Sequence, residues 1–580
     1  MKAKFYFLLF VLVMMCELAF TQDDRIAYLK DPELIEKNNF KSTENKSVTL
    51  KIPNQNSIVK YEPVVTSFGS PTFVPLGQTS IYDIQSDRTQ IWQDPLAPVN
   101  VHITFMYSND TIFADRRCGY YFSNDRGASW EFIGNVSESR LGFPTITGLT
   151  TGSAVIAAHA QDSGGCVRTL IFVDLGPGFG AFARLDPGCG LSTAYLWPAI
   201  VRSNTGQIVF AASGYTNRTN SLTPPGTFSG YSPYIGHPTG YDLAVSPTGK
   251  IGHAYIGEPS IDLGDVFFRE STDNGLSWSS PKKIWDFGMT KSFLGCLKGI
   301  SIVYGNNDLP YVVFETIKME TSGGFYPGLP SKIRIWSPTI NNGTSKIIAD
   351  ENNVPFFPNQ GIVSDGFAPV CRPVIGIYGT GGYLYVAFNA TTANVSPFDS
   401  SAFYSIYFTY SFNGSTWSVP EKLTPGSPLK DWRYVSISKR NQSVGPSFEV
   451  HLFSQEDEIA GSHVHGAPLS HANYTAIRFS STVNINGQLN SIPEIFSLNQ
   501  NYPNPFNPET VIEYDLSRSS DITLKIIDVS GKEIATLVNE KQNAGIYSVK
   551  WDARSYPSGI YFYELSAENY SKTKRMIVLK

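Results

Sequence analysis

A short repeat in the middle of the chain constrains its fold more than any other feature. Each copy consists of an apolar segment with alternating side chains, a turn containing glycine, and a second apolar segment. Copies occur at residues 197–212, 241–255 and 370–388. Alternation with a period of two residues on both sides of a glycine turn predicts a β-hairpin. A series of such hairpins predicts an all-β fold built from repeated units.

The hairpins group into seven units. Their first residues lie near Ile81, Phe143, Trp197, Tyr241, Cys296, Ala368 and Trp432. A spacing of roughly 45–70 residues is close to the length of one propeller blade. A count of six stays open, since two of these units could be halves of one blade. The predicted fold is therefore a β-propeller of seven blades, or alternatively six.

A second repeat, Ser-x-Asp-x-Gly-x-Ser-Trp, occurs at residues 123–130 and 271–278, and a shorter version with Asn in place of Asp occurs at 411–417. The Asp side chain can accept hydrogen bonds within the turn, and Gly allows a left-handed backbone. Trp can cover the hairpin with a large apolar surface. The motif residues are Ser123, Asp125, Gly127, Trp130, Ser271, Asp273, Gly275, Trp278, Ser411, Asn413, Gly414 and Trp417.

These motifs resemble the Asp-box, or bacterial neuraminidase repeat, of sialidase-type β-propellers. In that family the box lies away from the catalytic face. The resemblance therefore implies a structural role for these residues and indicates the fold rather than an activity.

The C-terminal segment has a different character. Residues 512–516, 522–527, 547–551 and 559–565 alternate like strands of a small immunoglobulin-like β-sandwich. Before them stands an unusual string of eight residues, which comprises Asn501, Tyr502, Pro503, Asn504, Pro505, Phe506, Asn507 and Pro508.

The segment from about residue 495 to 580 resembles the type A C-terminal sorting domain of the type IX secretion system of Bacteroidota and their relatives. The resemblance implies that the type IX machinery is a partner. It also implies a secreted or cell-surface location, reached through the periplasm and the outer membrane.

The N-terminus agrees with export. Lys2 and Lys4 precede an apolar run, and small residues follow near position 21, as in a cleavable signal peptide. No later segment has the length and apolarity of a membrane span, so we expect no transmembrane segment in the mature chain. The predicted organisation is a signal peptide (1–21), a polar extension (22–60), a propeller (61–492) and a sorting domain (493–580).

Composition narrows the class further. Gly and Pro number 49 and 37, and charged residues make up only 16% of the chain, which suits short strands joined by turns. The net charge is −5, so no basic face for nucleic acid is expected. Among the cysteines that remain after signal removal, Cys166 and Cys189 are nearest in sequence and are the first choice for a disulfide.

The resemblance to sialidases raises the question of catalysis. Such an enzyme needs three arginines to bind the substrate carboxylate, a Tyr nucleophile with a Glu, and an Asp acid/base. The Phe/Tyr-Arg-Ile-Pro string of that family is absent. Arg202, Arg372 and Arg433 occupy similar positions in their units and are candidates for a triad, with Glu315 as a catalytic candidate. The alternative, which we favour, is that these arginines are paired or solvated residues on strands.

Metal binding has two weak candidates. His463 and His465 alternate, with His471 close behind, and could share one face of a strand as ligands. The surrounding glycines indicate a loop instead. Calcium could bind at an Asn/Asp-rich loop such as residues 306–308, although such loops are mostly plain turns. No other cofactor is expected.

Two functions follow. The first is a secreted or cell-surface propeller that binds a glycan or protein ligand. The alternative is an exo-acting, sialidase-like glycoside hydrolase. A scaffold without a ligand stays open as a third reading, because the propeller architecture supports many functions.

Overall fold

The computed structural model describes residues 65–579, with gaps. The gaps are 162–165, 189–194, 214–216, 224–225, 233–239, 258–261, 289–292, 321–327, 329, 355–366, 379–381, 445–446, 484–496, 499, 502–503, 517, 543–544 and 568–569. The predicted signal peptide and extension, together with Cys189, Tyr502 and Pro503, lie outside the described residues. The chain divides into two compact units: one spans Tyr61–Glu494, and the other includes Ile495–Lys580.

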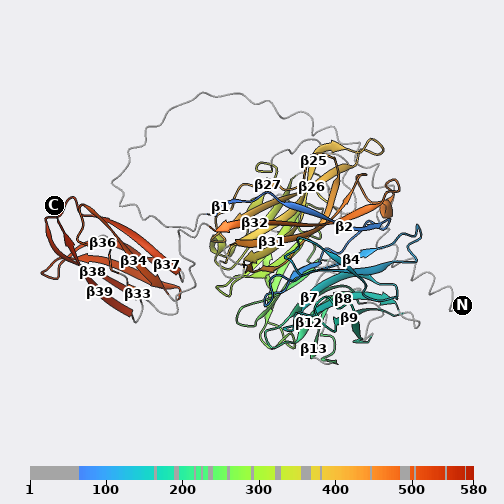
Figure 1. Ribbon diagram of the computed structural model, residues 1–580, viewed down its shortest axis with the longest axis horizontal. Helices are drawn as coiled ribbons and strands as arrows, with labels where there is room; N and C mark the ends of the chain where they lie inside the picture. Colours follow the sequence, from blue (N-terminus) through green and yellow to red (C-terminus); the bar gives the residue numbers. More distant parts are fainter. Residues whose placement is uncertain are drawn as a thin grey trace. The chain divides into compact units, whose positions relative to one another are not determined.

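The described part of the larger unit contains seven sheets, numbered along the chain (Figure 1). Their strands pair antiparallel, except that β29 (Arg440–Asn441) pairs with β24 (Val370–Tyr378) in parallel. Sheet 1 consists of β3 (Ile91–Gln93), β4 (Val101–Tyr107), β5 (Arg117–Ser123) and β6 (Glu131–Asn135). Sheet 2 consists of β7 (Gly142–Gly148), β8 (Ala154–Gln161), β9 (Val167–Asp174) and β10 (Phe182–Leu185). Sheet 3 consists of β11 (Leu196–Arg202), β12 (Ile208–Ser213), β13 (Asn217–Thr223) and β14 (Thr227–Phe228).

Sheets 4 to 6 follow the same pattern. Sheet 4 consists of β15 (Tyr241–Val245), β16 (Ile251–Ile256), β17 (Val266–Ser271) and β18 (Lys282–Trp285). Sheet 5 consists of β19 (Leu294–Gly295), β20 (Ile300–Tyr304), β21 (Pro310–Lys318), β22 (Ser331–Trp336) and β23 (Lys346–Ala349). Sheet 6 consists of β24 (Val370–Tyr378), β25 (Leu384–Val395), β26 (Ala402–Ser411), β27 (Glu421–Lys422) and β29 (Arg440–Asn441).

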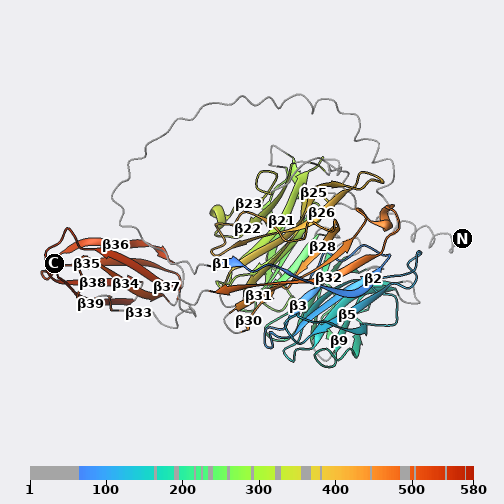
Figure 2. The same cartoon turned by 45° about the horizontal axis from the view of Figure 1, so that its top comes forward.

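Sheet 7 combines strands from both ends of the unit. It consists of β28 (Asp431–Ile437), β30 (Ser443–Val444), β31 (Ser447–Asp457) and β32 (Ala472–Val483), together with β1 (Val65–Phe68) and β2 (Thr72–Ser80). The N-terminal strand β2 pairs with β32 from Thr72↔Arg478 to Ser80↔Ala472. Figure 2 shows the blue β2 beside the orange β32. Both ends of the unit are therefore held in one sheet.

The sheets form a closed ring. One strand of each sheet contacts the next sheet, from β7 against β3 and β4 through β11, β15, β20 and β24 to β28, and β28 contacts β3 again. Apolar residues between neighbouring sheets make up the core clusters. This arrangement is a β-propeller, as the sequence repeats predict.

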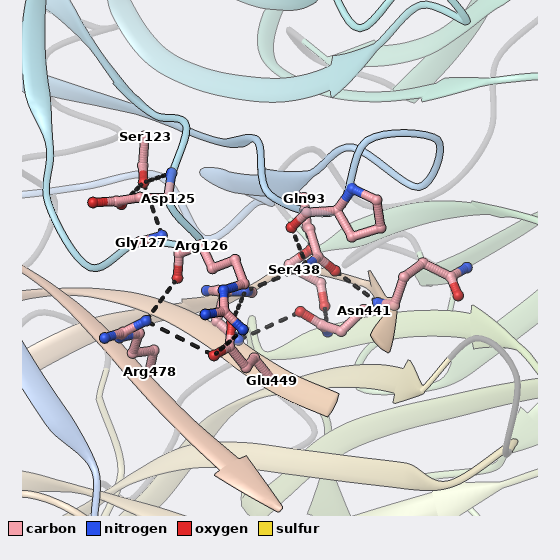
Figure 3. A network of polar contacts seen from close by, with 12 residues as sticks. Gln93, Ser123, Asp125, Arg126, Gly127, Ser438, Asn441, Glu449 and Arg478 are labelled. Atoms are coloured by element: carbon pink, nitrogen blue, oxygen red, sulfur yellow. Dashed lines mark hydrogen bonds and ion pairs between the residues drawn. The ribbon is translucent and has the colours of Figure 1, made fainter. Parts of the chain in front are cut away.

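Polar side chains close the seam between sheets 7 and 1 (Figure 3). Glu449 on β31 lies 4.0 Å from Arg126 and 3.8 Å from Arg478. Gln93 at the end of β3 donates its backbone N–H to Ser438 Oγ at 3.0 Å, and its side-chain oxygen accepts the Gln442 N–H at 2.7 Å. The last sheet is therefore fastened to the first by side chains as well as by apolar packing.

Four first strands contain the same irregularity. In β7 the pairing moves from Gly142↔His159 to Thr145↔Ala157, so two residues on one strand face one on the other, and β11, β24 and β28 do the same. Each irregularity is a β-bulge with one extra residue. Each bulge contains one large residue with positive φ: Phe143 (50°), Trp197 (48°), Arg372 (53°) and Tyr434 (54°). We call these four the bulge residues.

Proline explains part of this geometry. Pro144, Pro198 and Pro373 directly follow three of the bulge residues. Proline has no N–H, so it is tolerated in a strand only where the ladder is already interrupted, and a bulge is such a place.

The smaller unit is a two-sheet sandwich, in agreement with the prediction. Its sheets are β33 (Ser497–Leu498), β34 (Glu509–Leu516) and β37 (Gly545–Asp552); and β36 (Glu533–Gln542), β35 (Ser520–Ile527), β38 (Gly559–Ala567) and β39 (Tyr570–Val578). Phe506 of the proline-rich string is buried, and its ring lies 5.6 Å from that of Trp551.

Only two short 3-10 segments, η4 (Ile340–Gly343) and η5 (His463–His465), are helical in the described part of the chain. Within that part, no helix has the length and apolar character needed to cross a membrane. Cys166 forms a disulfide, whereas Cys118, Cys296 and Cys371 are buried free thiols.

Candidate functional site

The three Ser/Asp/Trp motifs lie at one end of the ring, in the turns between the third and fourth strands of sheets 1, 4 and 6. Ser123 Oγ donates to Asp125 Oδ1 and accepts the Gly127 N–H, both at 2.8 Å, and Asp125 Oδ1 accepts the Ser129 N–H at 2.9 Å. Residues 271–277 repeat this pattern. Asn413 accepts two backbone N–H groups at 2.8 Å in the shorter copy. These contacts hold the turn and leave no obvious role in chemistry.

The bulge residues lie at the opposite end of the ring. The Arg126 N–H donates to Val99 O, so the motif turns share an end with the loops that follow the first strands. The bulges stand near the first residue of those strands. We call the two ends the turn end and the bulge end.

Side chains from the preceding sheet hold three of the bulges. Met106 Sδ on β4 accepts the Phe143 N–H at 3.4 Å, and His159 Nδ1 on β8 accepts the Trp197 N–H at 3.3 Å. Glu315 Oε2 on β21 accepts the Arg372 N–H at 2.8 Å. The strained backbone is thus fixed from outside its own strand.

Glu315 is fully engaged in this role. Its other carboxylate oxygen accepts the N–H groups of Lys298 at 3.0 Å and Gly299 at 2.9 Å. The residue is buried on β21 of sheet 5. The carboxylate predicted as a catalytic candidate therefore bonds three backbone amides.

Replacing Glu315 with Ala should destabilise the propeller by about 3–9 kcal/mol, because each of three N–H groups loses its acceptor at about 1–3 kcal/mol. Glu315→Gln keeps one oxygen and should lose about half as much. Denaturant unfolding measures both. Glu421→Ala, at an exposed position of β27, is the control. A Glu315→Ala variant as stable as the wild type would contradict this role.

Arg372 and Arg433 come together, whereas Arg202 does not join them. The guanidinium carbons of Arg372 and Arg433 lie 4.6 and 4.9 Å from the ring centroid of Phe367. Arg202 ends β11, on the side of the turn end, where Asp94 is a nearby charge. The predicted three-arginine site is therefore not assembled from these residues.

Both gathered arginines already have carboxylate partners. Arg372 pairs with Asp87, and Arg433 Nε lies 2.6 Å from Asp431 Oδ2. The side chains are only 5% and 3% exposed. Burial raises the pKa of Asp431 to about 6, against the opposite influence of Arg433. The positive charges of Arg372 and Arg433 are therefore balanced by the carboxylates of Asp87 and Asp431.

The metal candidates are dispersed. His463 and His465 lie in a 3-10 turn instead of on a strand, and His463 Nδ1 contacts Ala467 O at 3.1 Å. His471 is exposed. In the Asn/Asp-rich loop, Asp308 pairs with Lys250 at 2.6 Å. The described residues contain no group of three possible metal ligands.

A small polar cavity lies between strands of several sheets. Polar side chains from sheets 1, 4, 5 and 7 surround a cavity of about 10 Å³, the space of a single water. Lys439 Nζ crosses this region to Asp242 Oδ2 at 2.6 Å. This cavity is too small for a sugar or a peptide.

An aromatic group occupies the bulge end of sheets 1 to 3. The ring centroids of Tyr82 and Phe113 are 4.9 Å apart, and those of Phe143 and His159 are 5.3 Å apart. Trp197 lies 6.4 Å from both Phe143 and His159. We call these five residues, with Arg116, the mouth cluster.

The mouth cluster was not predicted. Its sequence signal is a large residue directly before proline at the start of a unit, as in Phe143-Pro144 and Trp197-Pro198. Trp197 and Phe113 are half-buried, and the other members are buried. The cluster therefore presents aromatic surface at the edge of the ring.

Comparison with known proteins identifies the smaller unit. Residues 500–579 match the family described as the secretion system C-terminal sorting domain. No protein with a curated description matches the chain.

Similarity to solved structures is low. PorZ, a surface component of the type-IX secretion system of Porphyromonas gingivalis, is 12% identical over 87% of this chain and 61% of its own, with a TM-score of 0.35. Polysaccharide lyase Uly1 is 10% identical over 71% of this chain and 94% of its own, with a TM-score of 0.39. The BP39L lectin from Burkholderia pseudomallei is 10% identical over 67% and 98%, with a TM-score of 0.37.

The chain spans 61% of the length of PorZ. Residues 500–579 are a secretion system C-terminal sorting domain, and the protein is directed by the type IX system to the cell surface or the extracellular space.

Proposed function

We propose that the protein is a secreted or cell-surface β-propeller that binds a glycan or protein ligand at the bulge end of its ring, with a glycan favoured. One observation carries this proposal: equivalent bulges hold Phe143, Trp197, Arg372 and Tyr434 in a left-handed backbone conformation. Glycine adopts this conformation without steric strain. Large side chains there cost about 1–3 kcal/mol each, and such strain concentrates at functional sites.

The chemistry of the mouth cluster favours a sugar. Small-molecule sites combine aromatic walls with a few polar groups that fix orientation. Trp197 and Phe113 supply partly exposed rings, and Arg116 and His159 supply nitrogen donors beside them. This combination suits the apolar face and polar edge of a sugar ring.

We also propose how the propeller is organised. We take each of the seven sheets as one blade and the turns at 123–130, 271–278 and 411–417 as Asp-boxes. The ring contacts and the turn hydrogen bonds support both assignments. The domain limits follow as 61–492 for the propeller and 493–580 for the sorting domain, after a signal peptide (1–21) and an extension (22–60).

A sialidase-like hydrolase receives less support. Asp87 and Asp431 already pair with Arg372 and Arg433, so these arginines have little free charge for a substrate carboxylate. Glu315 is occupied by backbone amides.

Trp197→Gly in the full chain tests the proposal. Glycine removes the ring and relieves the backbone, so the melting temperature should change little while binding on a glycan array falls at least tenfold. Asn274→Gly, at φ 59° in a turn-end motif, is the matched control and should bind normally. Absence of any ligand on glycan and protein arrays would overturn the proposal, as would unchanged binding by Trp197→Gly. Turnover of a fluorogenic sialoside would favour the hydrolase.

A further inference from the structure

Arg116 is a buried cation without an acidic partner among the residues that the structure describes. It is 8% exposed. Its Nε donates to Leu141 O at 3.1 Å and its Nη1 to Tyr82 Oη at 3.2 Å. The guanidinium carbon lies 5.2 Å from the Tyr82 ring centroid and 5.9 Å from that of Phe143. Aromatic faces attract a cation, but they do not neutralise it as a carboxylate would.

His159 offers a second donor at the same place. Its Nδ1 accepts the Trp197 N–H, so in the neutral ring the proton is on Nε2. Burial, and then the charges of Arg116 and Arg140, lower the pKa of His159 well below its usual value. At neutral pH the ring therefore presents an Nε2–H group.

The two donors converge above Gly142. A Cβ atom built on Gly142 would lie 2.7 Å from Arg116 Nη2 and 2.7 Å from His159 Nε2. Neither nitrogen has a hydrogen-bond acceptor among the described residues. Because glycine has no side chain, the two nitrogens can lie this close to residue 142 and to each other. Two neighbouring donors, one of them charged, favour an oxygen with negative charge.

We propose that Arg116 and His159 bind the carboxylate of an acidic sugar whose ring stacks on Trp197. The proposal rests on the proposed glycan-binding function and names the class of ligand for that site. Arg372 and Arg433 cannot serve in this way, since Asp87 and Asp431 already balance them. A carboxylate would supply the charge and the acceptor oxygens that Arg116 lacks.

Calorimetric titration of the full chain tests this with three probes: a glucuronic acid oligosaccharide, sialyllactose and neutral lactose. We expect one acidic probe to bind at least tenfold more tightly than lactose, and which one binds identifies the source of the carboxylate. Binding of that probe should weaken as salt is added. Equal affinity for acidic and neutral probes would overturn the proposal but leave glycan binding intact. If no sugar binds in titration or on an array, the proposed function itself fails.

Two variants locate the site. Arg116→Met removes the charge at similar length, and Gly142→Ala places a methyl group 2.7 Å from Arg116 Nη2 and from His159 Nε2, so that these groups must move. Each should weaken binding of the acidic probe at least tenfold and weaken lactose binding much less. Gly176→Ala, in the turn between β9 and β10, meets only ordinary contacts and should bind like the wild type. If Arg116→Met does not fold, Gly142→Ala decides, and wild-type affinity in that variant would overturn the proposal.

Discussion

Deletion of residues 495–580 is expected to leave the propeller in the periplasm and to reduce its amount at the cell surface and in the medium at least tenfold. The sorting domain is an independent unit, and its core cluster consists only of residues from Leu498 onward. The propeller should therefore fold without it and lose only its export route. Cell fractionation with antibodies against the propeller measures the distribution.

Point variants separate recognition of a folded domain from the mere presence of the sequence. Trp551 is 1% exposed in the core of the sorting domain, and Trp551→Ala should destabilise that domain by about 3–5 kcal/mol. Export of the Trp551→Ala protein should fall by as much as export of the protein that lacks residues 495–580. Val529→Ala, at a position 72% exposed, should be exported normally. Undiminished surface display of the truncated protein would contradict the assigned role of the domain.

The repeats could be found in the sequence because each sheet is made mostly of strands that are adjacent in the chain. Predicted units near Phe143, Trp197 and Tyr241 start within two residues of β7, β11 and β15. The unit near Ile81 starts ten residues before β3 at Ile91. The strand before it, β2, pairs with β32 almost four hundred residues later, and local alternation carries no information about such a partner.

The site was harder to predict than the fold. A carboxylate at a strand end, such as Glu315, looks the same in sequence whether it faces a ligand or three backbone amides. Arg116 and His159 come from different sheets and meet only because Gly142 lets them approach. Each strained bulge arises because one strand has an extra residue opposite its partner strand, and this is visible only once the pairing register of the two strands is known. The large residue before proline is the one local sign of them.

Acidification from pH 7 to pH 5 should strongly destabilise the propeller. His102, His159, His253 and His451 are buried on β4, β8, β16 and β31. Burial lowers the pKa of His102 and of His451 to about 3, and lowers that of the other two well below 6.5. Unfolding exposes all four rings, which then bind protons near pH 6.5.

The sign follows from proton linkage. The unfolded chain binds more protons than the folded one between pH 6.5 and about 3, so stability is present above pH 6.5 and is lost as pH falls through this window. Each histidine contributes about 1.4 kcal/mol per pH unit. Burial raises the pKa of Asp431 to about 6, so on acidification this carboxylate binds a proton in the folded chain before it does in the unfolded chain. Below pH 6 this uptake offsets the stability loss caused by one histidine. Burial also raises the pKa of Asp174, Asp265, Asp457 and Glu449, and these groups offset a further part of the stability loss. A net loss of roughly 5 kcal/mol between pH 7 and pH 5 remains.

His102→Phe isolates one contribution. The His102 ring lies 4.9 Å from the rings of both Trp92 and Phe122, so an aromatic replacement suits its surroundings. The variant loses the 2.7 Å contact with Tyr120 Oη and is expected to be less stable at pH 7. Its stability should nevertheless fall less steeply with acid, by about 1.4 kcal/mol per pH unit, because one titrating group is gone. Denaturant unfolding at several pH values, followed by tryptophan fluorescence, measures the slope. His471→Phe, at an exposed position, should keep the wild-type slope, and an equal slope in His102→Phe would show that the buried rings do not drive acid sensitivity.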